Sequence, residues 1–474
     1  MADPKPALEA NVAAPREHNT HKVTWYRSTY WNCFILGLCN FLAPGIWGAM
    51  NSLGAGGMQR PYLVNAANAI SFSLMVLSCF FSSTVVHYIG VKYTLILGAM
   101  GYAPYAAGLY TNNKFGTEWS VLLGAVLCGL GAGLFWMSEA AIALSYPEPY
   151  NKGRFLGFWL SFRLAGQVLG GAINLGINAD RREAGSVSYA VYLVFIALQS
   201  LGPFIGLLIS KPENVQRTDG LKVKLSVDHS PWSELKSTAK LFITKKYLLT
   251  IPFIAQGIYT EAVMFTFSSL WFSVRVRALG SFLSGVVAII SGNLLGAFLD
   301  YSNISIKKRA RYAFVVVATL QGGWFIWATI LVTGYRKSLP TFDWLDSAFG
   351  SPFACFLFLI IGFQLNYMFF YFIVGNLAES PEEVVRISAL LRGTESAVQA
   401  VSYGLNSLES FAAVGGFYLN FGLWGISLYP AWLVIRQIGI IYNGPKEFQA
   451  GSETDSPESS GQPSAPVTVE VGNK

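Results

Sequence analysis

Apolar segments of about twenty residues alternate along this chain with short polar ones. A run of about twenty apolar residues is the length that crosses the hydrocarbon core of a bilayer as an α-helix. Twelve such segments occur in the sequence. The shorter alternating segments that are typical of a membrane β-barrel do not. The pattern therefore predicts an all-α membrane protein with twelve transmembrane helices, at 29–50, 66–86, 93–110, 119–144, 155–177, 189–209, 248–274, 282–299, 312–332, 353–374, 387–408 and 411–435.

A long polar segment, Lys211–Lys246, divides these apolar segments into two groups of six. A six-plus-six arrangement around a basic central loop is typical of membrane transporters built from two structural repeats. The sequence thus predicts two pseudo-symmetric six-helix halves. The expected parts are a cytoplasmic N-terminal segment (1–28), the first half (29–210), a cytoplasmic central loop (211–247), the second half (248–435) and a disordered cytoplasmic tail (436–474).

Composition and charge support an integral membrane location. Only 12% of the residues are charged, against roughly 25% in soluble domains. Most of the 33 Lys and Arg residues fall in alternate loops, which by the positive-inside rule places both termini in the cytoplasm. The pairs Arg181–Arg182, Arg275/Arg277 and Arg336–Lys337 fall in predicted outer loops, against this rule. The net charge of +7 is explained by topology and does not indicate nucleic acid binding. The plasma membrane and an endomembrane such as the vacuole both fit.

The two predicted halves repeat each other in detail. Arg163 and Gln167 in the fifth segment correspond to Glu395 and Gln399 in the eleventh, at a constant offset. We expect Arg163 and Glu395 to lie near the interface between the halves. A chance similarity between two helices is the alternative explanation.

Two polar loops carry the resemblance to a superfamily. The segment from Gly296 to Asp300, followed by Asn303, resembles the cytoplasmic G-x-x-x-D loop of the major facilitator superfamily. Its counterpart after the second segment is degraded, and it ends in Gly90 and Lys92. Gly90 and Asn303 occupy equivalent turn positions, and both tolerate a left-handed backbone. The resemblance implies that Asp300 and Lys92 are structural or gating charges.

One branch of that superfamily fits better than the rest. The stretches Gly37–Gly45, Gly48–Gly57 and Gly129–Trp136 resemble fungal Unc-ninety-three-like proteins. That resemblance covers about Asn32 to Ile435 and implies the twelve-span facilitator fold. Animal relatives include an ion-channel regulatory subunit and a trafficking chaperone. The resemblance therefore implies the fold more strongly than it implies a function.

Five charged residues fall within the predicted spans: Glu139, Arg163, Glu261, Arg392 and Glu395. A charge at that depth costs roughly 2.5–3.5 kcal/mol on insertion scales, so such residues pair with one another or line a watery path. Arg163 can pair with Glu139, and Glu395 with Arg392 or with a group on the second span. Each pair serves either as a structural lock between helices or as a gate. We expect Arg163, Glu395 and Arg392 to be structural or gating charges.

Glu261 lies near the middle of the seventh span, and the neighbouring spans six and eight offer no basic residue at its depth. An unpaired carboxylate there is protonated, with a hydrogen bond to a neighbour, or binds a cation. In the facilitator fold, spans one, four, seven and ten line the central cavity. The residues expected to bind substrate or couple protons are Glu261, Glu139, Gln256, Tyr259, Trp136, Gln364, Asn366 and Tyr367.

The aromatic lining with few polar anchors favours a small amphipathic organic metabolite, carried with or without protons. No enzyme, cofactor or metal motif occurs in the sequence, so we expect a protein that is not an enzyme and has no cofactor. The alternative is a regulatory or trafficking subunit that does not transport and binds another membrane protein. Other expected partners are the lipid bilayer and the unidentified metabolite.

Overall fold

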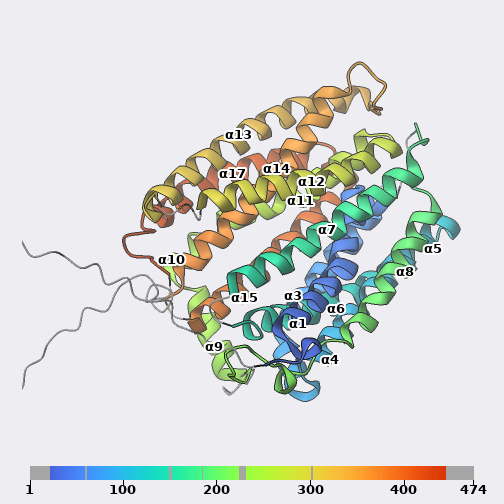
Figure 1. The fold of residues 1–474 in the computed structure, drawn as a ribbon. Helices are drawn as coiled ribbons and strands as arrows, with labels where there is room; N and C mark the ends of the chain where they lie inside the picture. Colours follow the sequence, from blue (N-terminus) through green and yellow to red (C-terminus); the bar gives the residue numbers. More distant parts are fainter. Residues whose placement is uncertain are drawn as a thin grey trace, which may run out of the picture.

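A computed structural model describes residues 22–444 of this chain, apart from 59–60, 149–151, 184, 224–230, 300, 302 and 380. In that part of the chain all the long elements are helices, and β-pairing is limited to isolated bridges (Figure 1). Residues 1–21 and 445–474, which hold most of the two predicted terminal segments, lie outside the described residues, and so does Asp300.

The helices follow the order that the apolar pattern predicts. The first group is α1 (Thr29–Asn40), α2 (Ile46–Ser52), α3 (Tyr62–Ile89), α4 (Val91–Ala99), α5 (Tyr102–Phe115), α6 (Glu118–Ser145), α7 (Lys152–Asn178) and α8 (Tyr189–Gly206). The second group is α9 (Pro231–Phe242), α10 (Lys245–Leu248), α11 (Ile251–Trp271), α12 (Val274–Leu299), α13 (Ile306–Ser338), α14 (Gly350–Leu377), α15 (Pro381–Asn406), α16 (Glu409–Ala412) and α17 (Gly415–Ile435). The polar central segment thus contains a helix, α9, where the sequence predicted only a loop.

Nine helical segments of the described chain are long and apolar enough to cross a membrane. They correspond to predicted spans one, two, four, six to ten and twelve. Of the other three predicted spans, the third is divided into the shorter helices α4 and α5. The fifth and eleventh are α7 and α15, which have 27 and 26 residues and carry more polar side chains.

Two predicted spans are broken for identifiable reasons. The first continues from α1 through a π-helical turn, Phe41–Gly45, into α2. Pro44 lies inside that turn, and its missing N–H cannot take part in regular α-helical bonding. The third is interrupted at Gly101, where a Cβ atom would lie 2.4 Å from the carbonyl oxygen of Leu127 on α6. Glycine therefore lets the two helices cross closely.

Both described ends of the chain and the central segment lie at one end of the bundle, which we call the termini end. The backbone N–H of Gln216 donates to the carbonyl of Arg27 at 2.8 Å, which joins the central segment to the beginning of the chain. The N–H of Gly444 donates to the carbonyl of Asn376 at 3.2 Å. Lys246 contacts the same end of α14 through the carbonyl of Leu377 at 3.0 Å. We call the opposite end the far end.

The two groups of helices meet through two long contacts, α3 against α15 and α7 against α12. Glycine makes the second one close: a Cβ atom on Gly171 would lie 2.6 Å from the backbone of Phe282, and one on Gly285 would lie 2.6 Å from Val168. Small residues that allow backbones to approach are typical of helix contacts in membranes. Each group contributes one helix with the repeated residues to these contacts. The two helices are α7 and α15, and both lie where the two groups meet.

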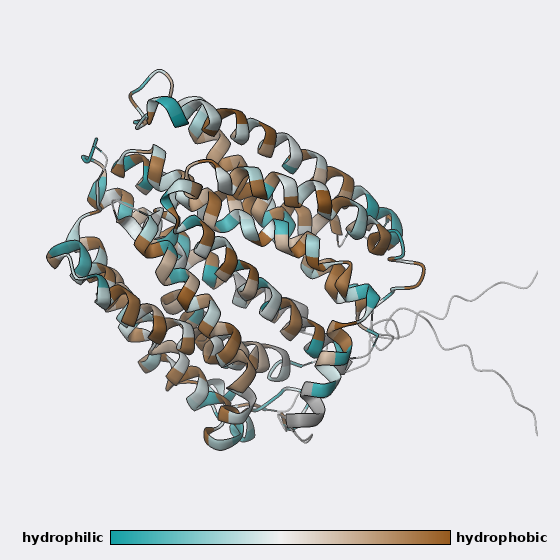
Figure 2. Ribbon diagram, turned by 180° about the vertical axis from the view of Figure 1, so that it is seen from behind, coloured by the Kyte–Doolittle hydropathy of each residue, from teal (hydrophilic) through white to brown (hydrophobic). Residues whose placement is uncertain are grey.

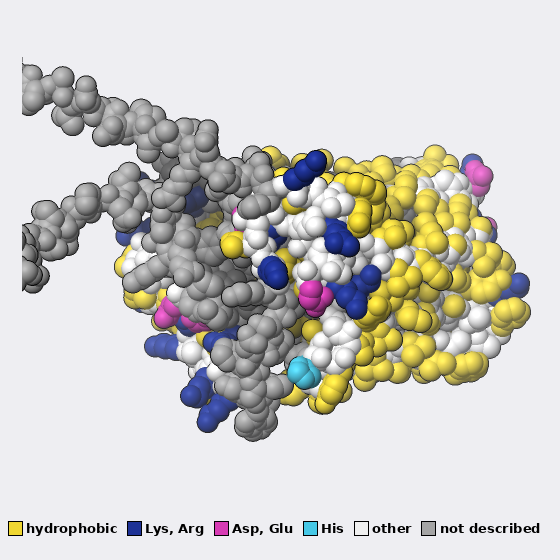
Figure 3. Space-filling model, turned by 60° about the horizontal axis from the view of Figure 1, so that its bottom comes forward, with side chains coloured by type: hydrophobic (Ala, Val, Ile, Leu, Met, Phe, Trp, Pro, Cys, Tyr) yellow, Lys and Arg dark blue, Asp and Glu magenta, His cyan; other side chains and the backbone are white. Residues whose placement is uncertain are grey.

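The surface of the bundle is apolar along its flank and basic at the termini end. Apolar residues dominate the middle of the helices in Figure 2, and Lys and Arg lie mainly in the left half and centre of Figure 3, whereas its right half is mostly apolar. Exposed flank residues include Phe80, Phe204, Leu294 and Ile330. Exposed apolar side chains on all sides are expected where lipid, not water, surrounds a protein. At the loop after α3, Gly90 has a φ of 81°, whereas Asn303 is not among the residues with positive φ.

Glu148 joins three segments at the termini end. Its buried carboxylate accepts hydrogen bonds from the Thr29 hydroxyl at 3.2 Å, the Thr218 N–H at 3.0 Å and the Thr218 hydroxyl at 2.8 Å. Burial raises the pKa of Glu148, but the hydrogen bonds from Thr218 and Thr29 outweigh it and hold the pKa below its usual range. The ionised form therefore stabilises the contact between the first helix, the end of α6 and the central segment.

We predict that Glu148→Gln lowers the unfolding free energy by about 1.5 to 3 kcal/mol at neutral pH, the range for hydrogen bonds to a charged group. Because the folded pKa lies below the unfolded value of about 4.3, the advantage of the wild type is complete above that pH. It disappears as pH falls through the folded pKa. Thermal unfolding of both proteins in detergent at pH 7 and pH 3 measures this, with the exposed Glu409→Gln as control. A difference that is undiminished at pH 3 contradicts the assignment.

Candidate functional site

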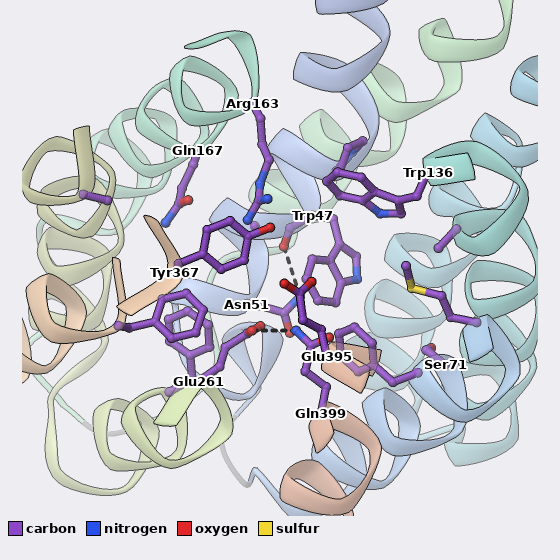
Figure 4. Close-up of a pocket in the computed structure, with 18 of the residues that line it drawn as sticks. Trp47, Asn51, Ser71, Trp136, Arg163, Gln167, Glu261, Tyr367, Glu395 and Gln399 are labelled. Carbon is purple, nitrogen blue, oxygen red and sulfur yellow. Dashed lines mark hydrogen bonds between the residues drawn. The ribbon is translucent and has the colours of Figure 1, made fainter. Parts of the chain in front are cut away.

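A cavity lies between the two groups of helices, and side chains of both line it. It offers about 110 Å³ to the centres of water-sized molecules, whereas about 10–15 Å³ accommodates one water. Its walls come from α2, α3, α6 and α7 on one side and from α11, α14 and α15 on the other. Figure 4 shows Arg163, Glu261, Tyr367 and Glu395 pointing into it. The cavity is therefore large enough for a small molecule and is chemically mixed.

Most of the predicted site residues line this cavity, but not all of them do. Lining residues that the sequence predicted are Trp136, Arg163, Glu261, Gln364, Tyr367, Arg392 and Glu395. The predictions for Gln256, Tyr259 and Asn366 were wrong in placing these side chains in the lining. Gln256 Nε2 donates to Asn366 Oδ1 at 3.1 Å, which joins α11 to α14. Tyr259 is buried in the apolar cluster beside them. The physical reason is helix rotation: these residues lie on the faces of α11 and α14 that contact other helices.

Glu261 is not an unpaired carboxylate. It accepts a hydrogen bond from Gln399 Nε2 at 2.7 Å (Figure 4). It accepts a second one from the Tyr403 hydroxyl at 3.1 Å, and both donors lie on α15. Its partners come from the eleventh predicted span and not from the neighbouring spans six and eight. Both donors are neutral, so Glu261 is held in place without a countercharge in direct contact. Such a group responds to the charge and hydration of the cavity.

Arg392 and Glu395, by contrast, form an ion pair within one helix. The distance from Arg392 Nη1 to Glu395 Oε2 is 2.8 Å. Arg392 Nη2 also donates to the hydroxyls of Tyr371 at 2.9 Å and Tyr367 at 3.1 Å. The guanidinium lies over the ring of Trp136, 4.5 Å from its centroid. A carboxylate, two hydroxyls and an aromatic face thus hold the half-buried Arg392 in place.

Arg163 mirrors Arg392 from the other side of the cavity. Its guanidinium lies 5.8 Å from the ring centroid of Tyr367 on α14 and 5.4 Å from that of Trp136 on α6. Each arginine therefore contacts an aromatic ring of the opposite group of helices. A cation over an aromatic face contributes about 0.5 to 2 kcal/mol. These reciprocal contacts hold the two groups together on one side of the cavity.

The ion pair suggested between Glu139 and Arg163 does not form. Glu139 is completely buried, and one of its carboxylate oxygens accepts a hydrogen bond from the indole N–H of Trp159. Trp159 precedes Arg163 by one turn on α7 and occupies the position beside Glu139, while Arg163 extends into the cavity. Glu139 does not line the cavity, and its second oxygen has no hydrogen-bond partner in the structure. Glu139 is thus a buried carboxyl behind the cavity wall.

The remaining cavity residues were not found from the sequence. They include Trp47, Asn51, Ser71, Phe72 and Gln167. Asn51 Oδ1 accepts a hydrogen bond from Asn68 Nδ2 at 2.9 Å, and Phe72 stacks on Tyr403 with ring centroids 5.6 Å apart. Gln167 alone carried a signal, because the repeat relates it to Gln399. Among the described residues no cluster of three or more His, Cys, Asp and Glu side chains offers a metal site.

Comparison with known proteins places this architecture in a family. A family profile described as "Ion channel regulatory protein UNC-93" matches residues 62–343, more than half of the chain. A protein from Aspergillus versicolor, "Notoamide biosynthesis cluster protein O'", is 39% identical over 89% of this chain and 92% of its own length. The chain belongs to the UNC-93 family. "UNC93-like protein 1" of Arabidopsis thaliana is 27% identical over 85% of this chain and 88% of its own length.

Solved structures show that the UNC-93 chain has the fold of major facilitator transporters. A D-xylose-proton symporter superposes with a TM-score of 0.59 at 13% identity, over 86% of this chain and 97% of that one. A POT family transporter in complex with 5-aminolevulinic acid gives 0.61 at 12% identity, over 86% and 96%. At such identities the likeness shows the fold alone. The chain is a multi-pass membrane protein, and its relatives in family and fold are transporters or channel regulators, not enzymes.

At the far end, Arg277 of this UNC-93 protein joins the two groups of helices. Only 1% of it is exposed. Its guanidinium donates to the carbonyls of Leu53 and Gly54 at 2.7 Å each, and to those of Met58 and Gly185 at 2.9 Å. These four acceptors belong to the first group of helices, whereas Arg277 belongs to α12. The arginine therefore closes the far end of the bundle through backbone contacts.

Arg275 also binds other residues of the protein. Because Arg275 and Arg277 both have such partners, their position in a predicted outer loop does not depend on the charge bias of the loops. The Nε of Arg275 donates to Asp343 Oδ1 at 2.7 Å, and the Ser273 hydroxyl donates to the same oxygen at 2.7 Å. The hydrogen bonds from Arg275 lower the pKa of Asp343 to about 2. At the termini end, Lys92 donates to the carbonyl of Leu207 at 2.7 Å and so caps the end of α8.

Proposed function

We propose that this UNC-93 protein is a transporter of the major facilitator type that moves a small amphipathic organic metabolite through the central cavity. The observation that carries the proposal is the cavity itself. It lies between two groups of helices, and it combines aromatic walls with a few charged and amide side chains. Sites for small organic molecules are mostly apolar, with a small number of placed polar groups. A protein that acts only as a scaffold has no need of such a lining.

The proposed membrane arrangement has twelve spans. Nine helical segments already meet the requirement of length and apolarity. We assign the other three spans to α7, to α15 and to α4 and α5 together. The last of these spans is interrupted between Ala99 and Tyr102. The polar character of α7 and α15 supports this assignment, because residues facing a cavity need not be apolar. The two halves, 29–210 and 248–435, then become the bodies that move relative to each other.

We propose further that the termini end faces the cytosol, since Lys and Arg gather there. Lys114 and the end of α5 then face outward at the far end. In a variant without native cysteines, a cysteine placed at Asn113 should react with an impermeant maleimide on intact cells. For protein located at the plasma membrane, reaction only after permeabilisation contradicts this orientation. The membrane in question is the plasma membrane or an endomembrane such as the vacuole.

Glu261 is the residue we assign to proton coupling. It lines the cavity, it is 8% exposed, and its two hydrogen-bond donors are neutral. A carboxyl in that position takes up a proton when the cavity closes and excludes water, and it releases the proton when water returns. Gln399 and Tyr403 keep it oriented in both states. Glu139 is the second candidate, because it too is buried without a countercharge in contact.

We predict that Glu261→Gln preserves abundance and membrane location but abolishes accumulation of substrate driven by a pH gradient. The amide keeps the shape of the side chain and removes the titration. A metabolite panel tested for uptake and efflux in cells, with and without a pH gradient, identifies the substrate. The variant is then compared with wild type and with the exposed Glu409→Gln control. Undiminished pH-driven transport in Glu261→Gln contradicts the assignment and moves it to Glu139.

A regulatory or trafficking subunit is the second candidate function. It is favoured by the description of the matching family profile as an ion channel regulatory protein. The degraded copy of the polar loop after α3 also favours it, because that loop controls gating in transporters of this fold. For a regulator, Glu261→Gln is expected to change neither partner binding nor abundance. Transport by the purified protein in proteoliposomes separates the two functions.

A further inference from the structure

The two arginines of the cavity differ in one respect. Arg392 contacts a carboxylate and two tyrosine hydroxyls. Arg163 has no ion pair or hydrogen bond from its side chain to any residue that the structure describes, and its neighbours are the ring faces of Trp136 and Tyr367. The guanidinium points into open cavity between those rings (Figure 4). One cation of the cavity is thus neutralised, and the other is available.

Carboxylates close to Arg163 are already used elsewhere. Glu139 accepts from Trp159, Glu261 accepts from Gln399 and Tyr403, and Glu395 pairs with Arg392. None of the three comes within 4.0 Å of the guanidinium nitrogens of Arg163 as an ion pair. An arginine at membrane depth is costly unless it is paired or hydrated. A cation kept there without a protein partner favours an anion that comes from outside the protein.

The surroundings define the chemistry of that anion. The guanidinium fork binds a carboxylate through two parallel N–H···O bonds. Trp136, Tyr367, Trp47 and Phe72 supply aromatic wall for an apolar body attached to it. We propose that Arg163 is the anion-binding residue of the cavity and that the substrate is an amphipathic carboxylate with an aromatic or alkyl body. This proposal rests on the transport function proposed above and names the class of its substrate.

The test compares acids with their neutral amides. The probes are phenylacetate, indole-3-acetate and hexanoate, each paired with its primary amide. Binding to the full-length protein in lipid nanodiscs is followed by ligand-observed NMR, with empty nanodiscs as the blank. A charge-assisted hydrogen bond contributes about 1.5 to 3 kcal/mol, which corresponds to a preference of about tenfold or more. We expect at least one acid to bind that much more tightly than its amide.

The variants assign the preference to Arg163. Arg163→Gln is expected to reduce it to less than about threefold, and Arg163→Lys, which keeps the charge but not the fork, to leave an intermediate value. The matched control Arg336→Gln changes an exposed arginine at the end of α13 and is expected to keep the full preference. A series in which no acid binds more tightly than its amide contradicts the proposal, as does a preference that survives in Arg163→Gln.

A second test uses the wild-type protein, so that its result does not depend on whether the variants fold. Phenylglyoxal modifies accessible guanidinium groups, and peptide mass spectrometry locates the modified residue. The bound acid is expected to protect Arg163, whereas its amide leaves the modification unchanged; equal protection by both contradicts the anion site. Uptake into proteoliposomes separates this inference from the proposed function. Acid-selective binding without uptake contradicts transport alone, and equal uptake of acids and amides contradicts the anion site alone.

Discussion

Charged side chains at membrane depth need partners, and this requirement organises the centre of the molecule. The hydrocarbon core offers no water, so each buried charge is paired, hydrogen-bonded or exposed to a hydrated cavity. Arg392 and Glu395 satisfy each other at 2.8 Å, and Glu261 is held by two neutral donors of α15. Four of the five charged residues found within predicted spans line one cavity. The cavity therefore lies where the polar faces of α7, α11 and α15 meet, and the apolar faces of the bundle are left for lipid.

The contacts between the two groups of helices differ in strength along the bundle, which bears on how the cavity opens. At the far end, Arg277 donates to four backbone carbonyls of the other group, and the hydroxyls of Ser52 and Ser281 lie 2.7 Å apart. In the middle of the bundle, beside the cavity, the groups are joined by the cation–aromatic contacts of Arg163 and Arg392. Cation–aromatic contacts are weaker than buried hydrogen bonds of a charged donor. The two groups are therefore held together more strongly at the far end than beside the cavity.

Much of this arrangement was predictable from the sequence, and the failures have a common physical cause. Length and apolarity predicted where the helices lie, and the repeat predicted that Arg163 and Glu395 lie between the halves. Side-chain partners depend on the rotation of each helix about its axis, which an almost uniformly apolar helix does not reveal. Trp159 instead of Arg163 therefore lies beside Glu139, and Gln256 turns from the cavity to Asn366. The structural role of Arg277 was not predicted, because loop charge bias treats every arginine near a helix end as solvated, whereas this one is buried against backbone carbonyls.

Distances across the two ends test the central claim, that two bodies move about one cavity, most directly. Spin labels at Lys114 and Ser347 report the far end, and labels at His87 and Lys308 report the termini end, measured by pulsed electron spin resonance in nanodiscs. Arg277→Gln removes the guanidinium contacts to four backbone carbonyls at the far end without changing the cavity lining. The account predicts that this variant adds a longer far-end distance together with a shorter termini-end distance. A folded Arg277→Gln protein in which both distance distributions match the wild type contradicts alternating access and favours a rigid regulatory subunit.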